Sequence, residues 1–128
     1  MRVLITDDEA DIRLTMSALL EHFGYSVRTA QNGAEALRCA EQWVPDVVLM
    51  DLSMPVMDGF LAMRKLRKTL GHDAMLIVAY SAHLQDPMTR QLARAAGCDE
   101  CLTKPVDADF LQELLSRHKR RLAASDVR

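Results

Sequence analysis

Short apolar runs alternate with stretches of helical periodicity five times along the chain, and this alternation constrains the fold more than any other feature. The run at residues 47–50 is uninterrupted, as expected for a central parallel strand that is covered on both faces. Short connections and right-handed crossovers place the intervening helices on both faces of one sheet. The sequence therefore predicts an α/β fold, a (βα)5 three-layer sandwich around a parallel five-stranded sheet.

Periodicity and capping residues predict where these elements begin and end. Gly24 and Gly97 are expected to end the first and fourth helices, because glycine readily adopts the left-handed backbone of a helix C-terminus. Asp86 and Asp107 are expected to cap the starts of the fourth and fifth helices. The predicted strands cover residues 3–5, 25–30, 47–50, 75–79 and 101–103. The inner face of the fifth helix is predicted to carry Phe110, Leu111, Leu114 and Leu115.

Size and charge restrict the class of protein. The 128 residues include 16 basic and 18 acidic side chains, so no basic excess favours direct nucleic acid binding. The longest apolar run, residues 74–80, is much shorter than the about 20 residues that a membrane-spanning helix needs. We therefore expect one compact domain at residues 1–122, a loosely held tail at residues 123–128, and no membrane association.

The cysteines and the N-terminus indicate the compartment. The chain has three cysteines, which are Cys39, Cys98 and Cys101. Their number is odd, and none is spaced from a histidine in the way that metal ligands are. The N-terminal segment turns acidic after four apolar residues, which is not the pattern of a signal peptide. We expect reduced thiols in a cytoplasmic protein.

Polar side chains follow four of the five predicted strands. In open α/β sheets the ligand site lies beyond the carboxyl ends of the strands, so these side chains are the candidate site. They are Asp7, Asp8 and Glu9 after the first strand, Asp51 after the third, Ser81 after the fourth, and Lys104 with Pro105 after the fifth.

Several carboxylates in one place repel one another unless a cation joins them. Oxygen ligands suit Mg²⁺, with Mn²⁺ as the alternative. With the ammonium of Lys104 and the hydroxyl of Ser81, such a site would neutralise a phosphoryl group. Asp51, at the end of the central strand, is the best-placed carboxylate nucleophile.

Each of these residues also has a structural interpretation when it is taken alone. An aspartate after a strand is often a helix cap or a turn residue. Lys104 and Pro105 form a plausible turn, and Ser81 a plausible surface hydroxyl. A functional site is favoured because polar side chains suited to bind an ion or a phosphate follow four of the predicted strands.

The combination of these residues resembles a known family. Asp7 and Asp8, the segment VVLMDLSMPVMDG around Asp51, then Ser81, and LTKP around Lys104 resemble the receiver domain of two-component response regulators, of the single-domain, chemotaxis-regulator-like kind. The resemblance covers residues 2 to 120 in order and spacing. It implies a flavodoxin-like fold with strand order 2-1-3-4-5.

The resemblance also implies a role for each site residue. Asp51 would accept a phosphoryl group from a sensor histidine kinase or a histidine phosphotransfer protein. Asp8 would bind Mg²⁺ directly, Asp7 largely through water, and the main-chain carbonyl of Ser53 would complete the protein ligands. Ser81 and Lys104 would hold the phosphoryl oxygens. The bond between Lys104 and Pro105 would be cis, an isomer that X-Pro bonds adopt at little cost.

The implied switch moves the Ser81 hydroxyl toward the phosphoryl group and shifts the fourth helix, with a readout surface formed by the fourth helix, fifth strand and fifth helix. The family usually has an aromatic residue where this chain has Cys101, which leaves the aromatic part of the switch in doubt. The Tyr80 ring either substitutes for this aromatic residue or simply packs in the core. Ser53 and His83 occupy positions that tune phosphate lifetime in the family, although His83 also fits a solvated loop histidine.

We therefore expect a phosphorelay signalling module that switches an unknown downstream protein and is no enzyme beyond its own phosphorylation and dephosphorylation. The alternatives are a receiver fragment of a hybrid kinase or larger regulator, and a phosphatase of the haloacid-dehalogenase type. That phosphatase would show Asp-x-Asp after the first strand, where this chain has Asp7-Asp8-Glu9. A flavodoxin-type electron carrier would need a hydroxyl- and glycine-rich loop at the same place.

Overall fold

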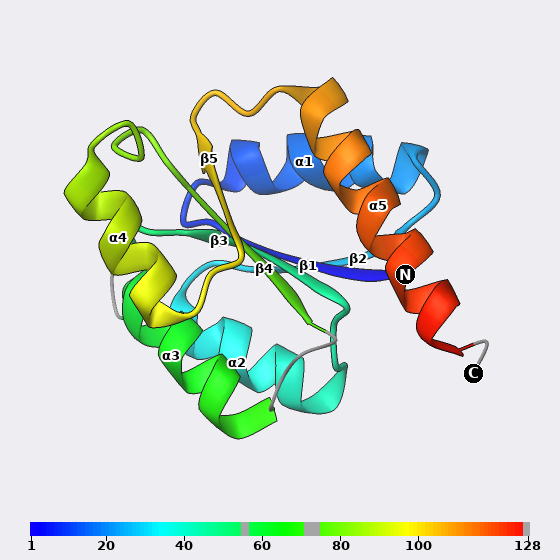
Figure 1. The fold of residues 1–128 in the computed structure, drawn as a ribbon, viewed down its shortest axis with the longest axis horizontal. Helices are drawn as coiled ribbons and strands as arrows, with labels where there is room; N and C mark the ends of the chain where they lie inside the picture. The colour runs from blue at the N-terminus through cyan, green and yellow to red at the C-terminus, as the bar shows by residue number, and fades with distance from the viewer. Residues whose placement is uncertain (55–56, 71–74, 127–128) are drawn as a thin grey trace.

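The computed structural model describes residues 1–54, 57–70 and 75–126, and it forms a three-layer α/β sandwich (Figure 1). The sheet is parallel, with strand order β2-β1-β3-β4-β5. Its strands are β1 (Arg2–Thr6), β2 (Ser26–Ala30), β3 (Val47–Asp51), β4 (Leu76–Ser81) and β5 (Glu100–Thr103). The helices are α1 (Ala10–His22), α2 (Gly33–Gln42), α3 (Gly59–Leu70), α4 (Pro87–Ala96) and α5 (Ala108–Asp126). The expected fold class and strand order are confirmed.

The two faces of the sheet carry separate apolar clusters. Val48 and Ile77 face the cluster beneath α2, α3 and α4, while Leu49 and Val78 face the cluster beneath α1 and α5 (Figure 1). Successive residues of a strand point to opposite faces, so the uninterrupted apolar runs of β3 and β4 fill both clusters. This packing places β3 at the centre of the molecule and Asp51 at the carboxyl end of its central strand.

The capping residues act largely as predicted. Asp86 accepts a hydrogen bond from the Met88 amide at the start of α4. Asp107 accepts hydrogen bonds from the amides of Asp109 and Phe110 at the start of α5. Gly97 follows α4 with φ 121°, the left-handed backbone that favours glycine.

One expectation about α5 is wrong. Phe110 is 50% exposed, whereas Leu111, Leu114 and Leu115 are buried, so the inner face does not include Phe110. Residues 110 and 111 lie about 100° apart around a helix, and only one of the two can point at the sheet. Helix α5 continues to Asp126.

An arginine of α3 ties the α4–β5 turn to the start of β4. The Arg67 guanidinium donates to the main-chain oxygens of Gly97 (2.9 Å) and Met75 (2.8 Å). It also pairs with the Asp99 carboxylate, which accepts the Ile77 amide at 2.8 Å. This network fixes the edge of the sheet opposite to the carboxyl ends of the strands.

Candidate functional site

Three carboxylates meet at the carboxyl ends of β1 and β3. One oxygen from each of Asp7, Asp8 and Asp51 lies within 4.8 Å of the other two. Asp7 is fully buried and Asp51 is 3% exposed, whereas Asp8 is exposed to solvent. Asp51 is the last residue of its strand rather than the first of a loop, so the β3 ladder positions its carboxylate.

The donor set of this cluster fits a hard divalent cation. All three groups offer carboxylate oxygens, which Mg²⁺ prefers, and the exposed side of Asp8 leaves room for the waters that Mg²⁺ retains. Two buried carboxylates without a cation would also repel each other strongly. The residues present therefore fit the metal that the sequence predicts.

Lys104 joins the cluster from the end of β5. Its Nζ lies 3.4 Å from an oxygen of Asp7 and 3.4 Å from an oxygen of Asp51. The Lys104 amide donates to the main-chain oxygen of Ser81 (3.0 Å), and the Lys104–Pro105 peptide bond is cis. Burial lowers the pKa of Lys104, but the nearby carboxylates of Asp51 and Asp7 raise it by more, so the side chain is an ammonium at neutral pH.

The environment of Asp51 disfavours its charge. Burial raises the pKa of Asp51 above its ordinary value of 3.8, and the neighbouring Asp7 carboxylate raises it further. The Ser53 amide, which donates to Asp51 Oδ1 at 3.2 Å, and the Lys104 ammonium lower the pKa but do not cancel the effect of burial. A bound cation would relieve this cost, so the site is built to gain positive charge.

Tyr80 is a site residue whose role the sequence did not predict. Its ring is buried on the α1 and α5 face of the sheet, and its hydroxyl donates to Asp7 Oδ2 (2.8 Å) and lies 3.2 Å from the Thr6 carbonyl. The Lys104 ammonium lies 5.0 Å from the ring centre. Tyr80 thus orients both a carboxylate and the ammonium of the site. The available signal was that a buried phenol needs a hydrogen-bond partner.

The remaining predicted residues make contacts with groups other than the three carboxylates. Ser81 is buried at the end of β4, and its Oγ accepts the His83 amide at 3.1 Å. His83 and Ser53 are exposed beside the site. Cys101 lies on β5 opposite Ala79 and contacts Cys98, away from the carboxylates.

The start of α3 lies unusually close to the end of β3. A Cβ atom on Gly59 would clash with the main-chain oxygen of Asp51 and lie 2.8 Å from the Leu52 Cα. Real Cβ atoms essentially never approach other atoms this closely, so only glycine allows this packing at the base of the Asp51 loop. The sequence alone gave no reason to single out Gly59.

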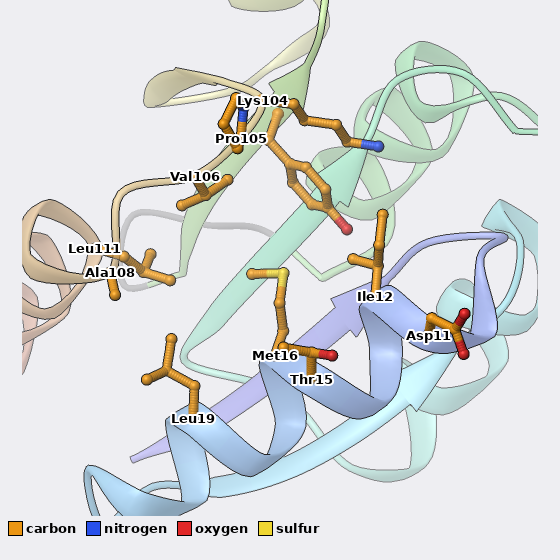
Figure 2. Close-up of a pocket in the computed structure, with 11 residues that line it drawn as sticks. Asp11, Ile12, Thr15, Met16, Leu19, Lys104, Pro105, Val106, Ala108 and Leu111 are labelled. Atoms are coloured by element: carbon orange, nitrogen blue, oxygen red, sulfur yellow. The ribbon is translucent and has the colours of Figure 1, made fainter.

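An apolar groove of about 660 Å³ borders the site between α1 and the segment that follows β5 (Figure 2). Ile12 and Met16 of α1 form one wall, and Pro105 and Val106 form the other (Figure 2). Lys104 lies at the end of the groove nearest the carboxylates, so a molecule in the groove would be close to Asp51.

No helix in the described ranges 1–54, 57–70 and 75–126 has the length and apolar character needed to cross a membrane.

Fold and site together define a flavodoxin-like α/β domain with an acidic cluster and a lysine at the carboxyl ends of its strands. The family model described as "Response regulator receiver domain" matches residues 3–116. The chain therefore belongs to the family of response regulator receiver domains.

Known relatives agree with this assignment. PilH of Pseudomonas aeruginosa is 35% identical over 115 residues, which cover 90% of this chain and 94% of PilH. The transcriptional regulatory protein PrrA of Mycobacterium tuberculosis is 35% identical over 118 residues, which cover 92% of this chain but 48% of PrrA. The crystallised chemotaxis protein CheY4 of Vibrio cholerae has a TM-score of 0.84 at 34% identity, covering 91% of this chain and 96% of CheY4. The chain thus spans nearly all of some relatives and about half of others.

Membership sets the general function. Receiver domains are signalling domains of two-component systems, interact with histidine kinases or phosphotransfer proteins and with downstream targets, and bind Mg²⁺ at an acidic cluster. The cluster of Asp7, Asp8 and Asp51 is the corresponding possible site in this chain.

Proposed function

We propose that this chain receives a phosphoryl group on Asp51 from a histidine kinase or histidine phosphotransfer protein. Asp7, Asp8 and Asp51, with the main-chain carbonyl of Ser53, would hold Mg²⁺. The observation that carries the proposal is the position of Lys104, whose ammonium lies 3.4 Å from both Asp7 and Asp51 carboxylates at the edge of the acidic cluster.

The chemistry follows from the two oxygens of Asp51. The Ser53 amide donates to Oδ1, while Oδ2 faces the Lys104 ammonium. In transfer from phosphohistidine, a carboxylate oxygen forms a bond to phosphorus as the phosphorus–nitrogen bond breaks and the imidazole leaves. A metal held by Asp7, Asp8 and Asp51 would supply positive charge that neutralises the phosphoryl oxygens. The Lys104 ammonium supplies a second, fixed positive charge on the same side.

Ser81 provides the response to phosphorylation. Its hydroxyl lies at the end of β4, next to the strand that carries Asp51, and now accepts only the His83 amide among the described contacts. Phosphoryl oxygens on Asp51 are strong acceptors that would draw this hydroxyl inward. Since the His83 amide is tied to Ser81 Oγ, the loop leading to α4 would move with it. Cys101 has no ring to rotate, so the loop carries the coupling.

The surface that receives this movement suits protein binding. Met88 and Leu92 on α4 are 61% and 51% exposed, and Phe110 on α5 is 50% exposed. Leu92 also lines a pocket with Phe60 and Leu61 of α3, so it lies on the side of α4 that faces α3. We assign the downstream partner to the surface formed by α4, β5 and α5, which the family resemblance implies and to which Met88 and Phe110 contribute exposed apolar side chains.

Phosphoramidate, a small donor with the phosphorus–nitrogen bond of phosphohistidine, tests the transfer. We expect the protein to take up one phosphoryl group per chain with Mg²⁺, on the peptide that contains Asp51. Steady multiple turnover of p-nitrophenyl phosphate would instead support the phosphatase alternative. Label on a histidine or serine peptide would contradict the assignment of Asp51.

A further inference from the structure

Two cysteines outside the acidic cluster lie in direct contact. Cys98 follows the end of α4, Cys101 lies on β5, and their sulfur atoms are 3.5 Å apart. Both face the apolar cluster beneath α2, α3 and α4. A disulfide bond joins sulfur atoms about 2.05 Å apart, so the two sulfur atoms would have to approach each other by about 1.5 Å to form one.

The backbone on both sides of this pair is anchored. The Cys98 amide donates to the Ala93 carbonyl at 3.2 Å, and the Asp99 amide donates to the Ile77 carbonyl at 2.8 Å. Arg67 holds the residues before and after Cys98 through the Gly97 carbonyl and the Asp99 carboxylate. The β4–β5 ladder holds Cys101 opposite Ala79. The contact between the two sulfur atoms is therefore a property of the fold and not of a free loop.

The two thiols differ in their exposure to solvent. Cys98 is 7% exposed, whereas Cys101 is partly exposed to solvent. Burial, followed by the contact with Cys101, raises the pKa of Cys98 to about 12. Cys98 therefore keeps its proton, and Cys101 is the sulfur that meets a small oxidant first.

We propose that Cys98 and Cys101 form a redox-active dithiol that a hydroperoxide oxidises reversibly to an intrachain disulfide. The Cys101 thiolate, whose proton has passed to solvent, attacks a peroxide oxygen, the oxygen–oxygen bond breaks, and Cys101 becomes a sulfenic acid; the departing hydroxide or alkoxide takes a proton from solvent and leaves as water or an alcohol. Cys98 sulfur then attacks Cys101 sulfur, the sulfur–oxygen bond breaks, and the departing hydroxide takes the Cys98 proton as water. The two thiols supply the two electrons that reduce the peroxide.

The position of the pair gives the oxidation a consequence. A disulfide would tie Cys98, just after α4, to Cys101 on β5. Both α4 and β5 belong to the surface to which the proposed function assigns the downstream partner. The redox chemistry itself does not depend on the proposed function. A chain that fails to accept a phosphoryl group would still show it.

Thiol counting after peroxide treatment tests the proposal. The folded protein is treated with a small excess of hydrogen peroxide, quenched with catalase, unfolded, alkylated with N-ethylmaleimide and weighed intact. We expect the number of alkylated cysteines to fall from three to one and to return to three after dithiothreitol. Trypsin should yield one peptide, residues 95–117, that contains both cysteines and has lost two hydrogens, because the Lys104–Pro105 bond resists cleavage.

Variants separate the pair from the third thiol. Cys39→Ser should still lose two alkylation sites on oxidation, because Cys39 lies on α2 and α3 packs between α2 and α4. Cys98→Ser should form no disulfide, with Cys98→Ala as the substitute if serine impairs folding. Full alkylation after peroxide, a sulfinic acid at Cys101 of the native chain, a disulfide to Cys39 or a disulfide-linked dimer would each overturn the proposal.

Discussion

The phenol of Tyr80 reaches the acidic cluster from the opposite side of the sheet to its neighbour Ser81. The alternation of side chains along a strand correctly predicts that the two residues face different ways. That rule does not predict how far a tyrosine extends. The Tyr80 hydroxyl passes the end of β3 and meets Asp7, 73 residues away in sequence.

Replacing Tyr80 by phenylalanine should weaken Mg²⁺ binding about 10-fold, because loss of a hydrogen bond to a ligating carboxylate commonly lowers metal affinity by that factor or more. The free energy of unfolding should fall by about 1 kcal/mol, the usual value of one such bond. Titration calorimetry with MgCl₂ measures the first effect. Tyr25→Phe, at a second buried tyrosine near Lys119, is the control and should leave Mg²⁺ affinity unchanged. Equal affinities in wild type and Tyr80→Phe would remove Tyr80 from the site.

Asp51→Asn should stabilise the metal-free protein at neutral pH. The pKa of Asp51 is raised in the folded state, so its ionisation favours the unfolded chain. The unfolded chain loses the proton near pH 3.8 and the folded chain at higher pH, so the contribution of Asp51 to stability declines as pH rises through that window. Urea unfolding in EDTA at a series of pH values measures the free energy of unfolding of both proteins. The excess of the variant over wild type should grow as pH rises across this window and should disappear below pH 3.8. If the variant were less stable than wild type at neutral pH, ionised Asp51 would not destabilise the folded protein, which would contradict this prediction.

At the scale of the elements, the order of strands and helices was predictable because strand and helix periods differ strongly and glycine and aspartate mark several ends. The sequence did not predict features that depend on how neighbouring elements pack against each other. Phe110 and Leu111 are both apolar, and only the packing of α5 on the sheet shows which one is buried. The contact between the free thiols of Cys98 and Cys101 was not predicted, because it depends on how the turn before β5 is anchored.

Gly59→Ala should destabilise the protein by about 1–3 kcal/mol, as expected for a methyl group forced into a packed site. The added Cβ would meet main-chain atoms of Asp51 and Leu52, which have no rotamer to change. The start of α3 must then move away from the end of β3 and disturb the backbone at Asp51 and Leu52. Urea unfolding measures the loss, and phosphoramidate labelling should slow as well. Leu61→Ala, at an exposed position of the same helix, is the control, and equal losses for both variants would exclude the steric explanation.

At the scale of the whole molecule, the candidate site is built from segments that only the complete sheet brings together. Asp7, Asp51, Ser81 and Lys104 come from the ends of four different strands. The sequence predicted this convergence because parallel strands end at the same edge. It did not predict burial, which decides the charge balance: Asp7 and Asp51 are shielded from water while Asp8 is not.

Mg²⁺ should therefore stabilise the whole fold, because binding to the folded state alone adds free energy that grows with ligand concentration. At 100 times the dissociation constant this amounts to about 2.7 kcal/mol. Thermal unfolding in MgCl₂, compared with NaCl at the same ionic strength, should show a higher midpoint. The shift should be much smaller in Asp8→Ala, where the replaced side chain is exposed and the core is untouched. A shift of the same size in NaCl would indicate general screening instead of a metal site.

Asp51 is expected to accept one phosphoryl group in a reaction that depends on the acidic cluster. Intact-protein mass spectrometry after incubation with acetyl phosphate tests it most directly, using wild type and Asp51→Asn, each in Mg²⁺ and in EDTA. We expect the mass of one phosphoryl group on wild type in Mg²⁺ and none under the other three conditions. The same gain on Asp51→Asn, or a gain on wild type that is undiminished in EDTA, would contradict it.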